Sequence, residues 1–456
     1  MINVPAGIFR AYDIRGLVNE DLSPEVVRLV GRALGTLVRR DAGNTVVMGR
    51  DGRLTSPEYA AAFASGVNAS GCNVLDAGLI PTPVLYYGVH RLDADGGVSV
   101  TASHNPAEYN GLKLLLGTHT LFGDAIQHLR EMIEREDFES GVGMVETVDL
   151  IEPYVAMVKE RVHLERPVRV VVDAGNGVAG MIVPRLYREL GCEVRELFCE
   201  VDGTFPNHHP DPTVEENVED LRAAVLEGHF DLGLGFDGDG DRIGVIDEGG
   251  RIVWGDRLTI LLARDVLSRN PGATIIYDVK CSSLLGDDIT AHGGRPLMCK
   301  TGHSFIKQKI RDEGALLAGE MSGHLFFGEN FFGHDDAAYA GAKLMEIYSR
   351  QRGPFSAQLD DLPEMFSTPE IRRPSSEEHK FEICERLRDE LASEFEVLAI
   401  DGVRVELGDG WGLARASNTS PKIILRFEAQ SAERLQEIRD LFESRLQRIE
   451  RELAGA

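Results

Sequence analysis

One local pattern occurs three times along this chain of 456 residues: a short run of apolar, mostly β-branched residues, a turn rich in Gly and Asp, and a longer stretch with helical spacing. The apolar runs begin at Thr45, Val168 and Ala273. Strands that alternate with helices in this way predict α/β domains with parallel or mixed sheets. The starts lie roughly 105 to 125 residues apart, about the length of one small domain. We therefore expect an internal triplication.

The pattern changes after Leu362–Pro369, and the segment Arg372–Ser376 (RRPSS) predicts a linker. Beyond it follow a charged helix, a Gly-rich turn, a strand at Ile423–Phe427 and an amphipathic helix from about Ala432, which together indicate an α+β unit. The expected fold is α/β, with three similar domains built on mixed sheets and a C-terminal α+β domain. The expected boundaries are 1–150, 151–252, 253–366 and 367–456.

The charge of the chain limits its partners. The formal net charge is -26, from 74 acidic and 48 basic residues. Such a field repels polyanions, which argues against nucleic acid and anionic membranes as partners. An anionic metabolite remains possible where Arg, Lys and backbone N–H groups gather. The six cysteines form no CxxC pair and no run of about 18 apolar residues occurs, so we expect reduced thiols and a cytoplasmic protein.

The first chemistry-bearing segment is Thr101–Pro106 (TASHNP), which follows the strand-like run Gly97–Thr101. This arrangement puts Ser103 on a turn that presents its hydroxyl. Asn105, which precedes a proline, favours a non-helical turn, and His104 is a neighbouring donor. An ordinary Ser/Asn turn explains these six residues equally well. The interpretation therefore depends on other parts of the chain.

The second segment, Asp237–Arg242 (DGDGDR), lies between the apolar runs Leu232–Phe236 and Ile243–Ile246. Three carboxylates separated by glycines can converge on one hard cation. Without an ion, the same carboxylates between buried strands would repel each other strongly, so a solvated acidic turn is the weaker interpretation. A calcium loop of the EF-hand type needs Gly where Arg242 stands and helices where strands are expected. Magnesium is therefore favoured.

Two later segments are suited to binding a sugar phosphate. In Gly319–His324 (GEMSGH), the side chains of Glu320, Ser322 and His324 alternate and would point the same way on an extended loop, as a clamp for sugar hydroxyls. The other segment, Arg415–Ser420 (RASNTS), combines a guanidinium with hydroxyl and amide donors, a composition typical of a phosphate site. Its candidate ligands are Arg415, Ser417, Asn418 and Thr419.

The four segments, in this order, resemble the signatures of the α-D-phosphohexomutase family. The GEMSGH form of the third segment is similar to the phosphomannomutase/phosphoglucomutase branch, whereas phosphoglucosamine mutases typically carry Gln in place of Met321. Phosphoglucosamine mutase is therefore the alternative. The resemblance implies four domains around a deep central cleft, with small-molecule sugar phosphates as partners and a monomer or weak dimer as the assembly.

For the reaction, the resemblance implies a phosphoserine at Ser103 and one Mg²⁺ per chain, held by Asp237, Asp239, Asp241 and an oxygen of that phosphate. A hexose 1- or 6-phosphate of mannose or glucose would be converted through a hexose 1,6-bisphosphate that turns over in the cleft. The remaining implied residues surround these groups. They are Arg242 beside the phosphate, Lys113 and His303 as acid/base candidates, and His104, Asn105, Arg15, Tyr12 and Lys280 in support.

Two other functions use similar parts. A metal-dependent sugar-phosphate phosphatase also combines a hydroxyl nucleophile with carboxylate-bound metal, but it must admit water, which a mutase excludes. A non-catalytic sugar-phosphate or calcium-binding module would not need Ser103. Because Arg415 is remote in sequence from the other segments, we also expect the last domain to close on ligand about a hinge.

Overall fold

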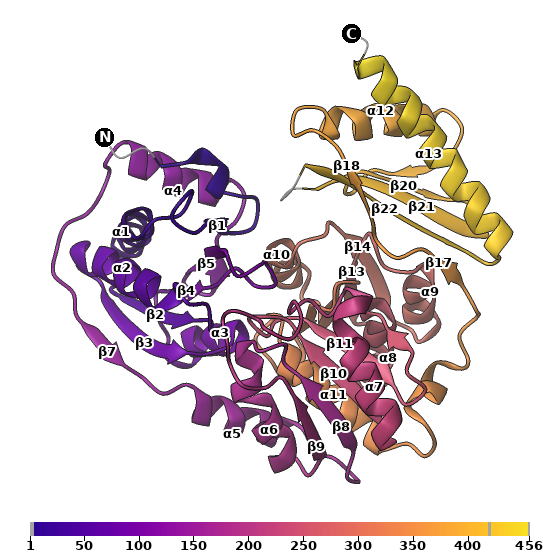
Figure 1. Cartoon of the computed structure of the whole chain (residues 1–456), viewed down its shortest axis with the longest axis horizontal. Coiled ribbons are helices and arrows are strands. Elements are labelled where there is room, and N and C mark those ends of the chain that lie inside the picture. The colour runs from indigo at the N-terminus through magenta and orange to yellow at the C-terminus, as the bar shows by residue number, and fades with distance from the viewer. Residues whose placement is uncertain (1–3, 418–420, 455–456) are drawn as a thin grey trace.

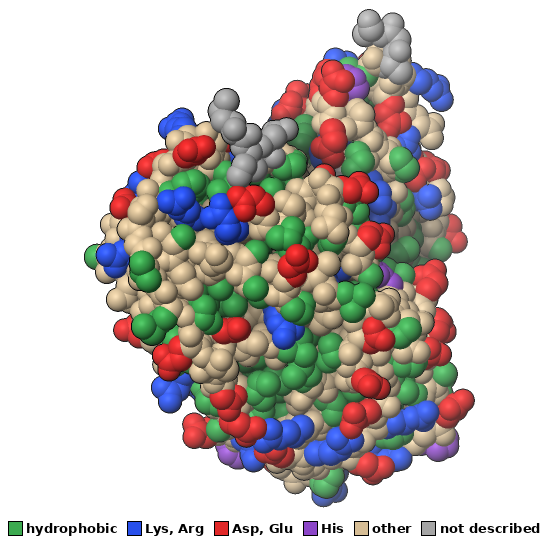
Figure 2. Space-filling model, turned by 60° about the vertical axis from the view of Figure 1, so that its left-hand side comes forward, with side chains coloured by type: hydrophobic (Ala, Val, Ile, Leu, Met, Phe, Trp, Pro, Cys, Tyr) green, Lys and Arg blue, Asp and Glu red, His purple; other side chains and the backbone are tan. Residues whose placement is uncertain are grey.

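In the computed structural model, which describes residues 4–417 and 421–454, the chain forms four β-sheets, each with its own helices. Figure 1 shows the N-terminal unit at the left, the second and third units below and to the right, and the C-terminal unit at the upper right. On the face drawn in Figure 2, acidic and basic side chains are interspersed, and a notch sets the C-terminal lobe apart at the upper edge. Within those ranges, none of the helices is long and apolar enough to cross a membrane.

The first unit contains a seven-stranded mixed sheet. Its elements are a 3₁₀ turn at Ala6–Ile8, β1 (Ile14–Leu17), α1 (Pro24–Arg40), β2 (Thr45–Arg50), α2 (Ser56–Ala69), β3 (Asn73–Leu79), α3 (Thr82–Arg91), β4 (Gly96–Val100), β5 (Tyr109–Leu116), β6 (His119–Thr120), α4 (Asp124–Glu134) and β7 (Val145–Thr147). Successive side chains of a strand face opposite sides. Val46 and Met48 accordingly pack with α1, α2 and α4, whereas Val47 packs with α3.

The second and third units contain five and four strands. The second comprises α5 (Ile151–Arg161), β8 (Arg169–Asp173), α6 (Val183–Glu189), β9 (Glu193–Leu197), α7 (Glu219–Gly228), β10 (Leu232–Phe236), β11 (Ile243–Asp247) and β12 (Ile252–Val253), with 3₁₀ turns at Val178–Met181 and Glu215–Val218. The third comprises α8 (Gly255–Arg269), β13 (Thr274–Asp278), α9 (Ser283–Ala291), β14 (Arg295–Cys299), α10 (His303–Glu313), β15 (Leu317–Gly319), β16 (Leu325–Phe327), α11 (Ala337–Ser349) and a 3₁₀ turn at Phe355–Leu359.

The predicted triplication is confirmed by the strand order. The three predicted strands are β2, β8 and β13, and each lies between two parallel neighbours. One of these neighbours then pairs with an antiparallel strand, which gives the orders β3-β2-β4-β5, β9-β8-β10-β11 and β14-β13-β15-β16. The serine, metal and sugar segments connect β4 to β5, β10 to β11 and β15 to β16. They therefore occupy equivalent positions in the three units.

The fourth unit is an antiparallel sheet covered by two helices, so the predicted α+β unit is confirmed. Its elements are β17 (Phe366–Ser367), β18 (Ile371–Pro374), α12 (Lys380–Ala392), β19 (Val397–Leu398), β20 (Val403–Glu406), β21 (Gly410–Ala416), β22 (Lys422–Ala429) and α13 (Ala432–Ala454). The linker predicted at Arg372–Ser376 was wrong, because most of it belongs to β18, which pairs with β22. Pro374 is tolerated because it ends an edge strand, where no ladder donor is needed.

Candidate active site

Ser103 lies on a buried turn that faces the metal segment. Its backbone is left-handed, with φ +52°, and its side chain is nearly inaccessible, at 2 % exposure. The hydroxyl donates a hydrogen bond to Asp237 Oδ2 at 2.8 Å and lies 3.1 Å from Nδ1 of His104. The serine and metal segments, 134 residues apart in the chain, therefore meet as a pair.

Arg53, which the sequence did not single out, holds the serine turn from behind. The residue is 1 % exposed and its Nε donates to Asp51 at 3.0 Å. Its two terminal nitrogens donate to four backbone carbonyls, those of Ser103 (2.8 Å), Asn105 (2.6 Å), Pro106 (2.6 Å) and Tyr109 (3.0 Å). A buried arginine that donates to four carbonyls of one loop fixes the path of that loop. In the sequence it looks like any solvated Arg.

The three aspartates of the metal segment form a buried acidic triad. One carboxylate oxygen from each residue lies within 4.8 Å of those of the other two, and each residue is at most 1 % exposed. Burial and the neighbouring carboxylates raise the pKa of Asp237 well above its usual range. The Oδ1 atoms of Asp239 and Asp241 accept no hydrogen bond from any residue between 4 and 417 or 421 and 454. Converging, partly unsatisfied hard oxygens fit a divalent cation such as magnesium.

The local backbone supports this triad and differs from an EF-hand. Asp237 Oδ1 accepts the N–H groups of Asp241 and Arg242, at 3.0 and 3.1 Å, and so closes the turn. Strands β10 and β11 flank it where an EF-hand has helices. Thr82, at the start of α3, donates its hydroxyl to Asp239 Oδ2 at 2.7 Å. This contact was not expected from the sequence.

Lys113 reaches the triad from β5. Its Nζ donates to Asp239 Oδ2 at 2.7 Å and to Asp241 Oδ2 at 2.5 Å, and the residue is 2 % exposed. Burial alone would lower the pKa of Lys113, but the two carboxylates outweigh it and raise this pKa well above the ordinary value. The β4–β5 pairing places Lys113 opposite Ser99, four residues before Ser103. Serine, lysine and acidic triad thus form one cluster.

The sugar segment is a tight turn, not the extended loop that alternation suggested. Gly323 has φ +88°, which favours glycine, and the N–H of Glu320 donates to the carbonyl of His324 at 2.9 Å. The predicted side chains are nevertheless neighbours. Ser322 Oγ donates to Glu320 Oε2 at 3.3 Å, and Arg242 Nε donates to His324 Nε2 at 2.9 Å. The last contact joins the sugar segment to the metal segment.

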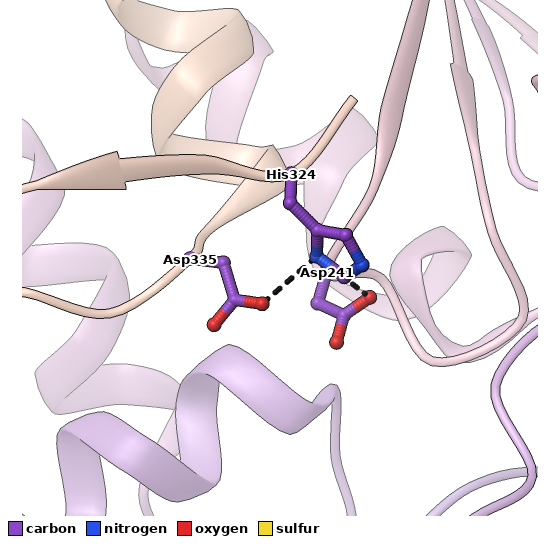
Figure 3. Close-up of side chains that lie close together, drawn as sticks. All are labelled: Asp241, His324 and Asp335. Atoms are coloured by element: carbon purple, nitrogen blue, oxygen red, sulfur yellow. Dashed lines mark ion pairs between the residues drawn. The ribbon is translucent and has the colours of Figure 1, made fainter. Parts of the chain in front are cut away.

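His324 points between two carboxylates from different loops (Figure 3). Its Nδ1 lies 2.8 Å from Asp335 Oδ2 and 3.6 Å from Asp241 Oδ1. The shorter distance is within ion-pair range, so we interpret the group as a His–Asp pair and not as a second metal site. Burial alone would raise the pKa of Asp335, but Lys307 and His324 hold it well below its usual range. Asp335 was not expected from the sequence.

The remaining predicted residues of the first and third units lie around this cluster. Arg15 donates to Asn105 Oδ1 at 2.8 Å and to Asp13 at 2.5 Å. Tyr12 donates its hydroxyl to the carbonyl of Thr301 at 3.0 Å, and its ring packs edge-on toward His303 at 6.3 Å. The contacts of Tyr12 tie the first unit to the start of α10.

The predicted phosphate residues are held by the third and fourth units. Arg415, on β21, donates to Asp401 Oδ2 at 2.8 Å, and the same oxygen accepts the N–H of Thr301 at 3.2 Å. Lys280 donates to Glu370 Oε2 at 3.1 Å. Ser417 is buried. The other two predicted ligands, Asn418 and Thr419, lie outside the described residues.

Comparisons with known proteins cover nearly the whole chain. Four family models of phosphoglucomutase/phosphomannomutase match it: α/β/α domain I over residues 6–140, domain II over 152–250, domain III over 254–366 and the C-terminal domain over 370–444. A phosphomannomutase/phosphoglucomutase of Pseudomonas aeruginosa is 49 % identical over 99 % of this chain and 97 % of its own length. A phosphoglucomutase of Neisseria gonorrhoeae is 45 % identical over 97 % of each. A crystal structure of a phosphoglucomutase/phosphomannomutase family protein from Burkholderia thailandensis, 46 % identical, covers 99 % of this chain and 98 % of its own with a TM-score of 0.93.

Proposed function

The chain belongs to the phosphoglucomutase/phosphomannomutase family, and we propose on this basis that it interconverts the 1- and 6-phosphates of mannose, glucose or both. The observation that carries the proposal is the buried contact between the Ser103 hydroxyl and Asp237, at 2.8 Å, within the acidic triad. A hydroxyl in such a site is suited to store a phosphoryl group between two transfers.

The charged groups of the cluster have two proposed roles, to hold the metal ion and to stabilise the charge of the phosphoryl group. A magnesium ion would be held by Asp237, Asp239, Asp241 and an oxygen of phosphorylated Ser103, and when bound it neutralises charge on the transferring phosphoryl group. Lys113 and Arg242 add positive charge beside the same group. Positioning and charge stabilisation are the main needs of a metaphosphate-like transition state.

The reaction consists of two transfers. In the first, the bond between the Ser103 Oγ and phosphorus breaks while the free sugar hydroxyl forms its own bond to phosphorus. That hydroxyl loses its proton to an acid/base candidate, Lys113 or His303, and the leaving Ser103 oxygen takes up a proton to become a hydroxyl again. The resulting hexose 1,6-bisphosphate turns over in the cleft. In the second transfer, its other phosphate returns to Ser103, which regenerates the phosphoserine and releases the isomeric monophosphate.

The other predicted residues hold the substrate in either orientation. Glu320, Ser322 and His324 would read the sugar hydroxyls. The phosphate that is not reacting would be held by Arg415, Ser417, Asn418 and Thr419, with Lys280 nearby. Around the serine turn, His104, Asn105, Arg15 and Tyr12 would hold the phosphoserine and its loop. The near-complete burial of Ser103 supports a mutase over a phosphatase, because a phosphoserine that must persist has to be shielded from water.

The experiment is a substrate panel on the purified protein. With Mg²⁺ and a trace of hexose 1,6-bisphosphate, mannose 1-phosphate or glucose 1-phosphate should yield the 6-phosphate, and chelation of the metal should abolish turnover. Turnover of glucosamine phosphate alone would move the chain to the phosphoglucosamine mutase alternative. Release of inorganic phosphate as fast as isomerisation would instead establish a phosphatase.

A further inference from the structure

A lysine that the proposed reaction does not use lies behind two of its histidines. Lys307, on α10, is 3 % exposed. Its Nζ lies 3.0 Å from Tyr86 Oη, 3.1 Å from His303 Nδ1 and 3.0 Å from Asp335 Oδ1, and it also lies 4.1 Å from the centre of the Tyr86 ring. Lysine is almost never buried without partners. Three partners in one place indicate that the amine has a specific task.

The number of partners fixes the direction of the hydrogen bonds. An ammonium has three donors and no acceptor, so all three neighbours of Lys307 accept from it. His303 must then offer the lone pair of Nδ1, and a neutral imidazole that accepts through one nitrogen carries its proton on the other. The Nε2 of His303 makes no hydrogen bond to any residue in the described part of the chain. That nitrogen is left for a ligand.

We propose that Lys307 is a positioning residue that holds His303 in the tautomer with its proton on Nε2, so that His303 meets the sugar phosphate as a hydrogen-bond donor. The inference rests on the proposed function and narrows the acid/base choice made there. It assigns His303 to donation and so removes His303 as the acceptor of the sugar hydroxyl proton.

The electrostatic surroundings of His303 agree with a neutral ring. Burial, together with the charge of Lys307, lowers the pKa of His303 well below its ordinary value. Three other ionisable groups act on this ring from separate elements. They are Asp335, which opposes the shift, and Lys113 and His324, which reinforce it.

The same ammonium orients the second histidine through Asp335. Lys307 binds Asp335 Oδ1, and the other oxygen of that carboxylate lies 2.8 Å from His324 Nδ1. Because Arg242 Nε donates to His324 Nε2, the proton of a neutral His324 stands on Nδ1. The two rings stack at 5.5 Å, with an angle of 21° between their planes. They thus carry their protons on opposite nitrogens.

Long-range ¹H–¹⁵N correlation spectra of the protein labelled with ¹⁵N-histidine test this assignment, with His303→Gln used to identify the resonances. We expect a proton on Nε2 of His303 at neutral pH. A proton on Nδ1, or on both nitrogens, overturns the proposal. The spectrum is recorded without substrate and on the unaltered chain. Once the His303 signals are assigned, it therefore decides the tautomer even where Lys307→Met fails to fold or the chain proves not to be a mutase.

Variants then test whether Lys307 is the cause. In Lys307→Met we expect the single tautomer to be lost and kcat to fall about tenfold to a hundredfold while KM changes little, with partial rescue in Lys307→Arg. The matched control is Lys309→Met, two residues along the same helix, where the amine is exposed and pairs with Glu313. An unchanged His303 tautomer in folded Lys307→Met contradicts the proposal.

Discussion

The first three units and the fourth hold their site residues in different ways. The serine, metal and sugar segments contact one another directly, through Ser103 with Asp237 and through Arg242 with His324. The fourth unit contributes Arg415, whose guanidinium donates to Asp401, an acceptor shared with the N–H of Thr301 in the third unit. The groups proposed to react are thus locked together by direct contacts in the absence of substrate. The group proposed to bind the idle phosphate depends on how the fourth unit is oriented.

A buried anchor sets that orientation. Arg404 donates to the carbonyls of Val279 and Cys281, at 2.6 and 2.8 Å, and Arg426 donates to the carbonyl of Lys280. The Arg404 guanidinium also lies 3.8 Å from the ring centre of Trp411, which shares β21 with Arg415. Within the described residues, the fourth unit is therefore anchored at the start of α9 and more lightly held at the site, where Arg415 pairs with Asp401 and Lys280 with Glu370. This difference suits a unit that closes on ligand, as the sequence led us to expect.

The largest loss of activity should come from replacing Ser103, where the serine segment contacts the metal segment. Ser103→Ala removes the proposed phosphate carrier, so we expect mutase activity to fall by at least about ten-thousandfold, as for other nucleophile deletions. Activity is measured with glucose 1-phosphate at saturating bisphosphate. The control is Ser268→Ala, on the outer part of α8. Activity within a few-fold of the parent would remove Ser103 from the mechanism.

A smaller effect is expected from loosening the turn that presents the serine. Arg53→Met leaves four backbone carbonyls of the serine turn without their donor, which misplaces Ser103, and we expect kcat to fall about a hundredfold. Circular dichroism and thermal unfolding check that the variant is folded. Arg91→Met, at the exposed end of α3, is the matched control. A folded Arg53 variant with parental kcat would show that the turn holds its own shape.

On the lightly held side, the effect should fall on binding. Arg415→Met removes a guanidinium proposed to hold the phosphate that does not react, so we expect KM to rise about tenfold with kcat nearly unchanged. Initial rates across a range of glucose 1-phosphate separate the two constants, with Arg386→Met on the exposed face of α12 as the control. A loss in kcat alone would show that Arg415 acts in the chemical step, like the serine and metal segments, and would contradict the proposed difference between the first three units and the fourth.

The smallest expected effect is a pH-dependent loss of stability at His208, in the second unit. Burial alone would lower the pKa of His208, but the Asp173 carboxylate, 3.1 Å from its Nε2, outweighs burial and raises this pKa. A raised folded-state pKa adds stability at low pH that is lost as pH rises through that pKa. His208→Gln should therefore lower the free energy of unfolding by less than about 1 kcal/mol at pH 5.5 and have no such effect at pH 9. Urea unfolding at both pH values, with His128→Gln as the control, checks this; an equal loss at both pH values would contradict it.

The sequence predicted most of the fold and the acidic triad because the patterns that indicate them are local in the chain. The strand runs at Thr45, Val168 and Ala273 became equivalent strands of three sheets, and the acidic triad was visible as three Asp spaced by Gly. It failed at Arg372–Ser376, where turn-forming residues belong to an edge strand paired with β22, more than 45 residues away in the chain. The domain boundaries given by the sequence stay predictions.

The residues that sequence missed act through long-range contacts. Arg53, Lys307 and Asp335 are charged side chains of common types, and nothing adjacent to them in the chain marks them as buried. Each becomes buried and paired only because the fold brings distant segments together. For example, Lys307 on α10 contacts Tyr86 on α3, which is 221 residues away in the chain. Motif composition pointed to the groups that are proposed to touch a ligand. The groups that hold them in place require the structure.

The central claim, that Ser103 stores the phosphate, is tested most directly by mass spectrometry of peptides from the purified protein. After incubation with hexose 1,6-bisphosphate and removal of the ligand, we predict one phosphate per chain on the peptide that contains Ser103. Addition of excess glucose or mannose 6-phosphate should lower this occupancy as bisphosphate forms. A chain that isomerises its substrate while Ser103 stays unmodified at every stage would contradict the account.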